Sequence, residues 1–228
     1  MLNLVIADAA LETIPIEIFQ HPSLKKIRDS GKKPTEILLD RTFHHFAIVS
    51  STLNENHKRG RPDILHIMLL NALATPLFKK NLVKVFVHTI NNQVIRIGDY
   101  LRIPKSYSRF EGLALDLIKN KKIVSKDGSL LLELSDNLSF PNLIQKKIKP
   151  DFVIGFSTNG ILKTFEGTCN ELFQFKNPCV VIGGFPSGHF SKDIESCIDK
   201  LYSISDLSLE AHVVVSRLLY EWEKINGF

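Results

Sequence analysis

Five glycines in the last third of the chain lie at the ends of two apolar runs. Gly155 and Gly160 end the first run, and Gly183, Gly184 and Gly188 end the second. Glycine lets bare backbone approach a ligand closely, so the two loops predict the wall of a cofactor site. Taken singly, each glycine is explained by turn chemistry at a strand end. Their concentration at two successive strand ends favours a ligand.

A third segment of small and polar residues, 203–208, follows the two glycine loops. It consists of Ser203, Ile204, Ser205, Asp206, Leu207 and Ser208. A Rossmann site would need G-x-G-x-x-G after the first strand and an acid about 20 residues on, and neither is present. A P-loop would need Lys after its last glycine, but Ile161 follows Gly160. The three segments therefore suit a nucleotide-bearing cofactor that is held by backbone, with its base in an apolar slot.

Three basic residues, Arg102, Lys105 and Arg109, surround Tyr107 at the expected head of a helix. Their spacing predicts that Lys105 and Arg109 share a helical face. Guanidinium groups and helix-terminal amides both suit phosphate oxygens, which favours an RNA contact. A solvated basic face is the alternative reading.

Arg61 and Asp63 lie two residues apart across Pro62. The simplest interpretation is a local ion pair that steadies a loop. His66, three residues further on, is interpreted as a packed histidine whose hydrogen bonds are satisfied.

The composition of the chain limits the classes of protein to which it can belong. The chain has 228 residues, of which 44% are hydrophobic, so it can bury a sizeable core. A net charge of +5 makes a polyanionic partner reasonable without requiring one. Cys169, Cys179 and Cys197 form no C-x-x-C pair, and nothing resembles a signal peptide, which indicates a reducing cytoplasm. No histidine pattern indicates zinc, and no apolar run predicts a membrane span.

The apolar pattern predicts elements that alternate along the chain. Strands are expected at 2–7, 37–40, 83–89, 94–97 and 130–134, with a central strand within 63–77; helices are expected from Pro22 to before Gly31, from near Pro104 to 118, and over 211–225. Strands that alternate with helices predict an α/β fold with a largely parallel sheet. We expect one domain over 1–228.

The order of the three loop segments resembles that of the trefoil-knotted SPOUT methyltransferases, which hold S-adenosylmethionine in such loops. Upstream, R-P-D-I-L-H at 61–66 and L-R-I-P-K-S-Y-S-R-F-E-G-L at 101–113 resemble the signature motifs of one SPOUT family. That family acts in ribosome biogenesis and methylates N1 of a pseudouridine in small-subunit rRNA. The resemblance implies a SPOUT-type sheet with a C-terminal knot at about 151–228, and an inserted β-hairpin and helix subdomain at about 40–125.

The resemblance also implies roles for particular residues. The cofactor contacts would be Phe156, Gly160, Gly183, Gly184, Gly188, Ser203, Ile204, Ser205, Asp206, Leu207 and Ser208. The rRNA contacts would be Arg61, Arg102, Lys105 and Arg109, with Lys105 standing where the family has arginine. Arg61 and Asp63 would form the catalytic pair, in which Asp63 either removes the N1 proton or holds Arg61 in place. No metal is implied.

The function expected from this resemblance is S-adenosylmethionine-dependent methylation of small-subunit rRNA. The expected partners are that rRNA, a second copy of the chain in a homodimer, and ribosomal assembly proteins, with no membrane. The expected location is the cytoplasm, or the nucleolus in a nucleated cell. Two alternatives stay open: a non-catalytic rRNA-binding assembly factor with the same fold, and a methyltransferase for another RNA such as tRNA.

Overall fold

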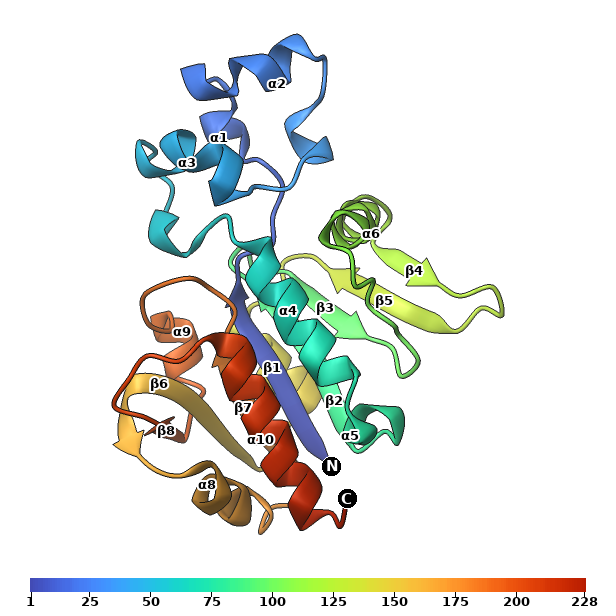
Figure 1. The fold of residues 1–228 in the computed structure, drawn as a ribbon, viewed down its shortest axis with the longest axis vertical. Coiled ribbons are helices and arrows are strands. Elements are labelled where there is room, and N and C mark those ends of the chain that lie inside the picture. The colour runs from blue at the N-terminus through green and yellow to red at the C-terminus, as the bar shows by residue number, and fades with distance from the viewer.

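The computed structural model describes all 228 residues and contains one eight-stranded sheet, in the order β4-β5-β3-β2-β1-β7-β6-β8 (Figure 1). The strands are β1 (Leu2–Ala9), β2 (Val83–Thr89), β3 (Val94–Ile97), β4 (Lys122–Val124), β5 (Leu130–Ser135), β6 (Phe152–Leu162), β7 (Pro178–Gly183) and β8 (Lys200–Ser203). The pairs among β2, β1, β7, β6 and β8 are parallel, whereas β3, β5 and β4 extend the sheet antiparallel. The predicted mostly parallel α/β sheet is confirmed.

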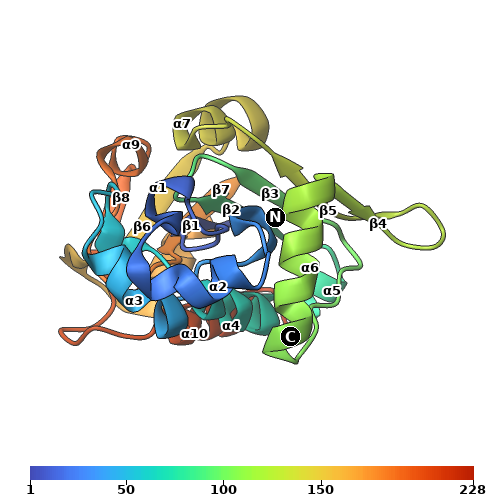
Figure 2. The same ribbon diagram turned by 90° about the horizontal axis from the view of Figure 1, so that it is seen from above.

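Helices cover both faces of this sheet (Figure 2). One face carries α4 (Pro62–Leu73), α5 (Pro76–Lys79), α6 (Tyr107–Asn120), α8 (Phe165–Leu172) and α10 (Ala211–Ile225); the other carries α7 (Phe140–Asn142), the π-helix Leu143–Ile148 and α9 (Lys192–Glu195). Alternate residues of β1 enter the two cores: Leu4 and Ile6 the larger one, Val5 and Ala7 the smaller. Because both faces are covered, β1 reads as a continuous apolar run.

A small helical lobe follows β1 and lies beyond the carboxyl end of that strand (Figure 1). It contains α1 (Ile16–Phe19), α2 (Lys25–Asp29), α3 (Arg41–Val49) and the 3₁₀ turns Pro22–Leu24, Pro34–Glu36 and Asn56–Lys58. Its own core is Ile14, Ile18, Leu24, Leu39, Ala47 and Ile48. The helix expected from Pro22 is confirmed. The strand expected at 37–40 is reduced to a single bridge between Thr13 and Leu38, because Asp40 instead caps α3 by accepting from the Thr42 amide at 2.8 Å.

The central strand predicted within 63–77 is wrong, because this run forms α4 and α5. A helix buried on several sides is apolar all round, and its sequence resembles that of a buried strand. Here α4 packs against the sheet, α6 and α10, with Leu65, Met68 and Leu69 buried. Pro62 occupies the first helical position, where proline is favoured.

The start predicted for α6 is also corrected. The helix begins at Tyr107 rather than near Pro104, so Lys105 lies in the bend before it and shares no helical face with Arg109. The hairpin of β2 and β3, strand β5 and helix α10 form as predicted. The predicted insertion at 40–125 stays a prediction; the range spans α3, α4, β2, β3 and α6. No helix has the length and apolarity that crossing a membrane requires.

Candidate cofactor and RNA site

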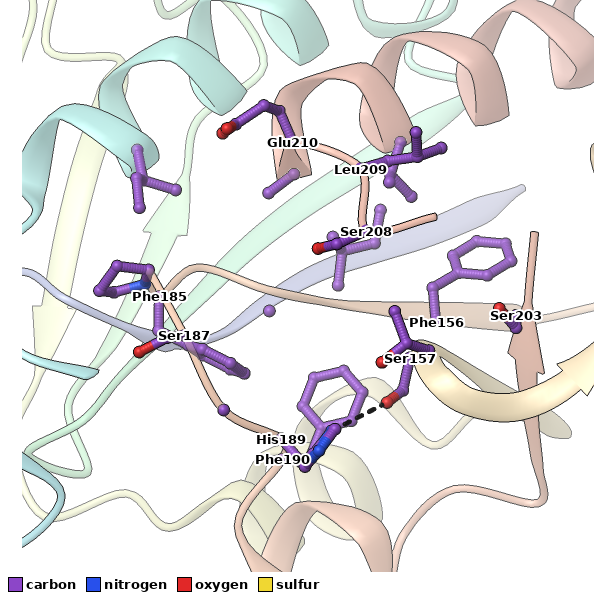
Figure 3. Close-up of a pocket in the computed structure, with 18 of the residues that line it drawn as sticks. Phe156, Ser157, Phe185, Ser187, His189, Phe190, Ser203, Ser208, Leu209 and Glu210 are labelled. Carbon is purple, nitrogen blue, oxygen red and sulfur yellow. Dashed lines mark hydrogen bonds between the residues drawn. The ribbon is translucent and has the colours of Figure 1, made fainter. Parts of the chain in front are cut away.

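A cavity of about 500 Å³ lies at the carboxyl ends of β6, β7 and β8 (Figure 3). Three segments enclose it: residues 157–160, which we call the β6 bulge; residues 184–191, the β7 loop; and residues 204–210, the β8 loop. The first turns of α4 and α10 complete the wall with Ile64, Ala211 and Val214. Its volume is in the range of pockets that bind small molecules and cofactors.

The β6 bulge exists because the pairing of β6 with β8 is interrupted. Phe156 and Ile161 both pair with Tyr202, so the four residues between them leave the ladder. At Gly160 the strand returns against β8 so closely that a β-carbon would lie 2.4 Å from the Tyr202 carbonyl carbon. Only glycine permits that approach.

Eight of the predicted cofactor residues line the cavity. They are Phe156, Gly183, Gly188, Ser203, Ile204, Ser205, Leu207 and Ser208. Gly160, Gly184 and Asp206 do not line it. A β-carbon at Gly184 would meet Ile6 at 2.7 Å and the Ala9 backbone at 3.0 Å, so this glycine allows the β7 loop to pass close to β1. The cofactor roles of all these residues stay predictions.

Phe156 forms part of both the cavity wall and the main core. The residue is buried, and its ring packs against Phe165 with centroids 5.8 Å apart. Phe190, Ile182 and Val214 supply further apolar surface to the cavity. A bulky aromatic residue therefore has a place here as part of an apolar slot.

The remaining lining residues apart from Arg61 were not predicted as individual cofactor contacts, although most lie in the segments predicted to form the wall. These are Ile64, Ser157, Thr158, Ile182, Phe185, Pro186, Ser187, His189, Phe190, Leu209, Glu210, Ala211 and Val214. Most lie in the β6 bulge, the β7 loop or the β8 loop, which gather where ligands commonly bind on parallel sheets. Figure 3 shows His189 of the β7 loop facing Ser157 of the β6 bulge, with Nδ1 and Oγ 3.5 Å apart.

An ionic cluster around Glu171 of α8 holds β8 against β6 below the β8 loop. The Tyr202 hydroxyl donates to Glu171 at 2.6 Å, Lys200 Nζ lies 2.8 Å from the same carboxylate, and Lys163 also pairs with it. Partial burial opposes the charge of Glu171, but these donors outweigh it and lower its pKa to about 2. The Lys163 amide donates to the Ser203 carbonyl at 2.8 Å, so the cluster fixes the start of the β8 loop.

Arg61 lines the cavity and forms a two-point contact with Asp63. Arg61 Nε and Nη2 each donate to one carboxylate oxygen at 2.8 Å. Partial burial acts to raise the pKa of Asp63, but the hydrogen bonds and charge of Arg61 outweigh it, so the pKa lies below its ordinary value. Asp63 is thus an ionised partner of Arg61, and the predicted ion pair is present.

Arg102, Lys105 and Arg109 are all exposed, and none forms an ion pair. His66 of α4 fixes their segment: its Nε2 lies 2.7 Å from the Pro104 carbonyl, and its ring stacks on Phe110 with centroids 4.5 Å apart. The Tyr107 hydroxyl donates to Asp40 at 3.3 Å, which joins the segment to the helical lobe. His66 is therefore packed and satisfied, as predicted. Arg61 directly precedes α4, so this helix positions Arg61 and also supports the cationic segment.

The fold and the cavity define a SPOUT-type α/β methyltransferase. The model of the EMG1/NEP1 methyltransferase family matches residues 4–223, and the chain belongs to that family. It is 41% identical to the "Ribosomal RNA small subunit methyltransferase Nep1" of Thermococcus sibiricus and 39% identical to that of Pyrococcus furiosus, each over 98% of both chains. Among solved structures, Archaeoglobus fulgidus Nep1 bound to S-adenosylhomocysteine matches with a TM-score of 0.83 and 31% identity, over 99% of both chains.

Proposed function

We propose that this chain is an S-adenosylmethionine-dependent methyltransferase that acts on N1 of a pseudouridine in small-subunit rRNA during ribosome biogenesis. One observation carries the proposal: Arg61, the expected rRNA contact, borders the same cavity as the three expected cofactor segments. A single site therefore brings together the group that orients RNA and the walls that hold a cofactor. The family and the names of its relatives support the same activity.

The residues of the cavity fit S-adenosylmethionine. Phe156, Ile182 and Val214 offer an apolar slot for the adenine, and the Ser203 to Ser208 segment offers hydroxyls and backbone for polar groups. When bound, S-adenosylmethionine supplies an electrophilic methyl group on a sulfonium. Phe156, Gly183, Gly188 and the segment Ser203–Ser208 are proposed to bind it. Gly160 and Gly184 are proposed to shape the loops rather than to touch the ligand.

The chain's own contribution to the reaction is positioning. Methyl transfer from a sulfonium requires the N1 nucleophile to be held in line with the bond that breaks, and that demands little acid–base chemistry. We propose that Arg61 orients the target nucleotide, that Asp63 holds Arg61, and that Arg102, Lys105 and Arg109 contact phosphates. The target base must be unstacked to reach the cavity, as in other enzymes that modify bases.

We also propose a homodimer, joined where α4 and α10 lie side by side (Figure 1). The apolar stripe of α10 is not available for this interface, because it is buried within the chain's own core through Val214, Leu218 and Trp222. The exposed apolar residues of the two helices are Ile67 (39% exposed) and Tyr220 (61%). Ribosomal assembly proteins are further proposed partners, and the cytoplasm or nucleolus the proposed location.

Transfer of a labelled methyl group tests the proposal. Matched stem-loops that differ only in carrying uridine or pseudouridine at one unpaired position should be incubated with labelled S-adenosylmethionine. Label is expected in the pseudouridine RNA alone. Tight RNA binding without any transfer would instead support the non-catalytic assembly factor, and transfer to a tRNA but not to the rRNA stem-loop would support the tRNA alternative.

A further inference from the structure

The 3₁₀ turn Asn56–Lys58 contains a fully buried lysine that none of the roles above uses. The Lys58 side chain is 1% exposed. Its Nζ donates to Asp8 Oδ2 at 3.0 Å and lies 2.7 Å from Glu55 Oε1. A buried ammonium must be paired in this way, because removing it from water is costly.

The same ion pair contacts the β7 loop of the cofactor cavity. Lys58 Nζ lies 4.8 Å from the centre of the Phe185 ring, and that ring lines the cavity. Asp8 Oδ2 also accepts a hydrogen bond from the Ser191 amide at 3.3 Å. The pair thus touches the β7 loop near both of its ends.

Two further contacts seat the β7 loop directly on the turn. The Ser187 hydroxyl donates to the His57 carbonyl at 3.3 Å. Gly188, with φ of +100°, passes so close to the turn that a β-carbon would lie 2.8 Å from His57 Nε2. The turn therefore forms the outer support of the β7 loop.

Asp8 adopts an uncommon backbone conformation at the carboxyl end of β1. Its φ is +49°, and the pairing of β1 with β2 shifts register between Ile6 and Ala9. Left-handed backbone is unfavourable for residues other than glycine and persists where the surroundings impose it. A buried ion pair also gives little net stability compared with apolar packing. The left-handed backbone of Asp8 and the buried ion pair are both explained by a role in fixing local geometry rather than in adding stability.

We propose that Lys58 is a positioning residue for cofactor binding: paired with Asp8, it holds the β7 loop in the shape that receives the cofactor. The inference rests on the proposed function, since it assigns the cavity to S-adenosylmethionine. Arg61 follows Lys58 by only three residues. One short segment therefore supports the cofactor loop and presents the residue proposed to orient RNA.

The neighbouring ion pair provides a matched control. Arg59 Nη1 lies 2.5 Å from Glu12 Oε2, and Asn91 Nδ2 donates to the same oxygen at 3.0 Å. This pair is also buried and anchors the same segment, but neither Glu12 nor Arg59 lines the cavity. Breaking it perturbs the segment without removing a contact to the β7 loop.

Titration with S-adenosylhomocysteine by calorimetry tests the inference. Lys58→Met should weaken its affinity by about tenfold or more, because the cation–π contact to Phe185 is lost and Asp8, which bonds the Ser191 amide, loses its counter-ion. Glu12→Gln should change the affinity by less than about threefold. An unchanged affinity in folded Lys58→Met, or an equal loss in Glu12→Gln, would overturn the positioning role. Failure of the wild-type protein to bind would instead overturn the proposed function.

Kinetics separate positioning from general destabilisation. In Lys58→Met, KM for S-adenosylmethionine should rise by about tenfold, while kcat at saturating cofactor stays within about threefold of wild type. If Lys58→Met does not fold, Asp8→Asn decides the matter, because asparagine tolerates left-handed backbone and keeps the side-chain shape. Asp8→Asn is expected to weaken S-adenosylhomocysteine binding similarly, and full affinity in this variant would overturn the inference.

Discussion

The contact between Arg61 and Asp63 distinguishes the two roles proposed for Asp63, which are a general base and a partner that holds Arg61. A general base should have a free carboxylate and a pKa near the working pH. Asp63 instead uses both oxygens on Arg61, and its pKa lies below the ordinary value of about 3.9. The geometry favours a carboxylate that holds Arg61 in its bidentate pose.

Asp63→Asn tests this assignment. The change removes the charge and leaves one acceptor for Arg61, so RNA affinity should fall by about tenfold and match that of Arg61→Ala. Binding is measured by fluorescence anisotropy with a labelled pseudouridine stem-loop. Normal RNA affinity together with abolished methylation would show that Asp63 is the base.

The pH dependence supplies an independent check on the same variant. Because the folded pKa of Asp63 is lowered, the ion pair stabilises the fold at pH values above the ordinary carboxylate pKa and is lost as the pH falls through the folded pKa. Asp63 is therefore ionised throughout pH 5 to 8. Any change in methylation rate across that range should persist in Asp63→Asn, and its disappearance would contradict the assignment.

Among the elements, those with a clear period were predicted, and so was the short apolar strand β1, but the long apolar run over 63–77 was assigned to a strand although it is helical. The alternating strands β2 and β3 and the helical stripe of α10 could be predicted, because one of their faces is polar. Helix α4 could not, because burial against the sheet, α6 and α10 removes its polar face. At the site, the glycines identified two of the three segments, but their sequence does not distinguish Gly183, which borders the cavity, from Gly160, which packs against β8.

Gly160→Ala should distort the β6 bulge and the start of the β8 loop. The added methyl group would lie 2.4 Å from the Tyr202 carbonyl carbon and 2.7 Å from the Ser203 amide, and backbone cannot yield as a flexible side chain does. We expect at least about tenfold weaker binding of S-adenosylhomocysteine by calorimetry. Gly112→Ala is the control: nothing lies within 4 Å of the new methyl group, and an exposed helix should gain about 1 kcal/mol. Unchanged cofactor affinity in folded Gly160→Ala would refute the structural role.

The three cations before and at the start of α6 should supply part of the electrostatic affinity for RNA. Each phosphate neutralised contributes roughly 0.7 to 0.9 log units of affinity per log unit of salt. Replacing Arg102, Lys105 and Arg109 by alanine should weaken binding and flatten that slope. Alanine at the exposed Lys119, Lys122 and Lys126 makes the same change in charge near the other end of α6 and should leave the slope close to wild type. Equal slopes for the two triple variants would mean that these three cations do not face RNA.

On the scale of the whole molecule, the parallel sheet places all three proposed cofactor segments at one edge, and the helical lobe stands above that edge. Pattern reasoning predicts the α/β class but no knot, because chains rarely thread loops. The knot expected for the SPOUT class enters through family resemblance alone. The homodimer is likewise a proposal, because its interface would be covered only in the assembled dimer.

Tyr220→Asp should convert the proposed homodimer into a monomer. Tyr220 lies exposed on α10 beside α4, and a carboxylate there would be desolvated in the interface without a partner. Light scattering at micromolar concentration measures the mass, for which 25.8 kDa is the monomer value. Tyr100→Asp, at a tyrosine that is 74% exposed outside the two helices, should remain dimeric. A monomeric wild-type protein would contradict the proposal.

The position of the transferred methyl group tests the central claim most directly. The pseudouridine stem-loop should be methylated with S-adenosylmethionine, digested to nucleosides and analysed by chromatography with mass spectrometry against synthetic standards. N1-methylpseudouridine is expected as the sole new nucleoside, formed by the wild-type protein and strongly reduced with Arg61→Ala. A methyl group on N3, on the ribose or on a nucleotide other than pseudouridine would contradict the claim, as would the absence of any methylated product.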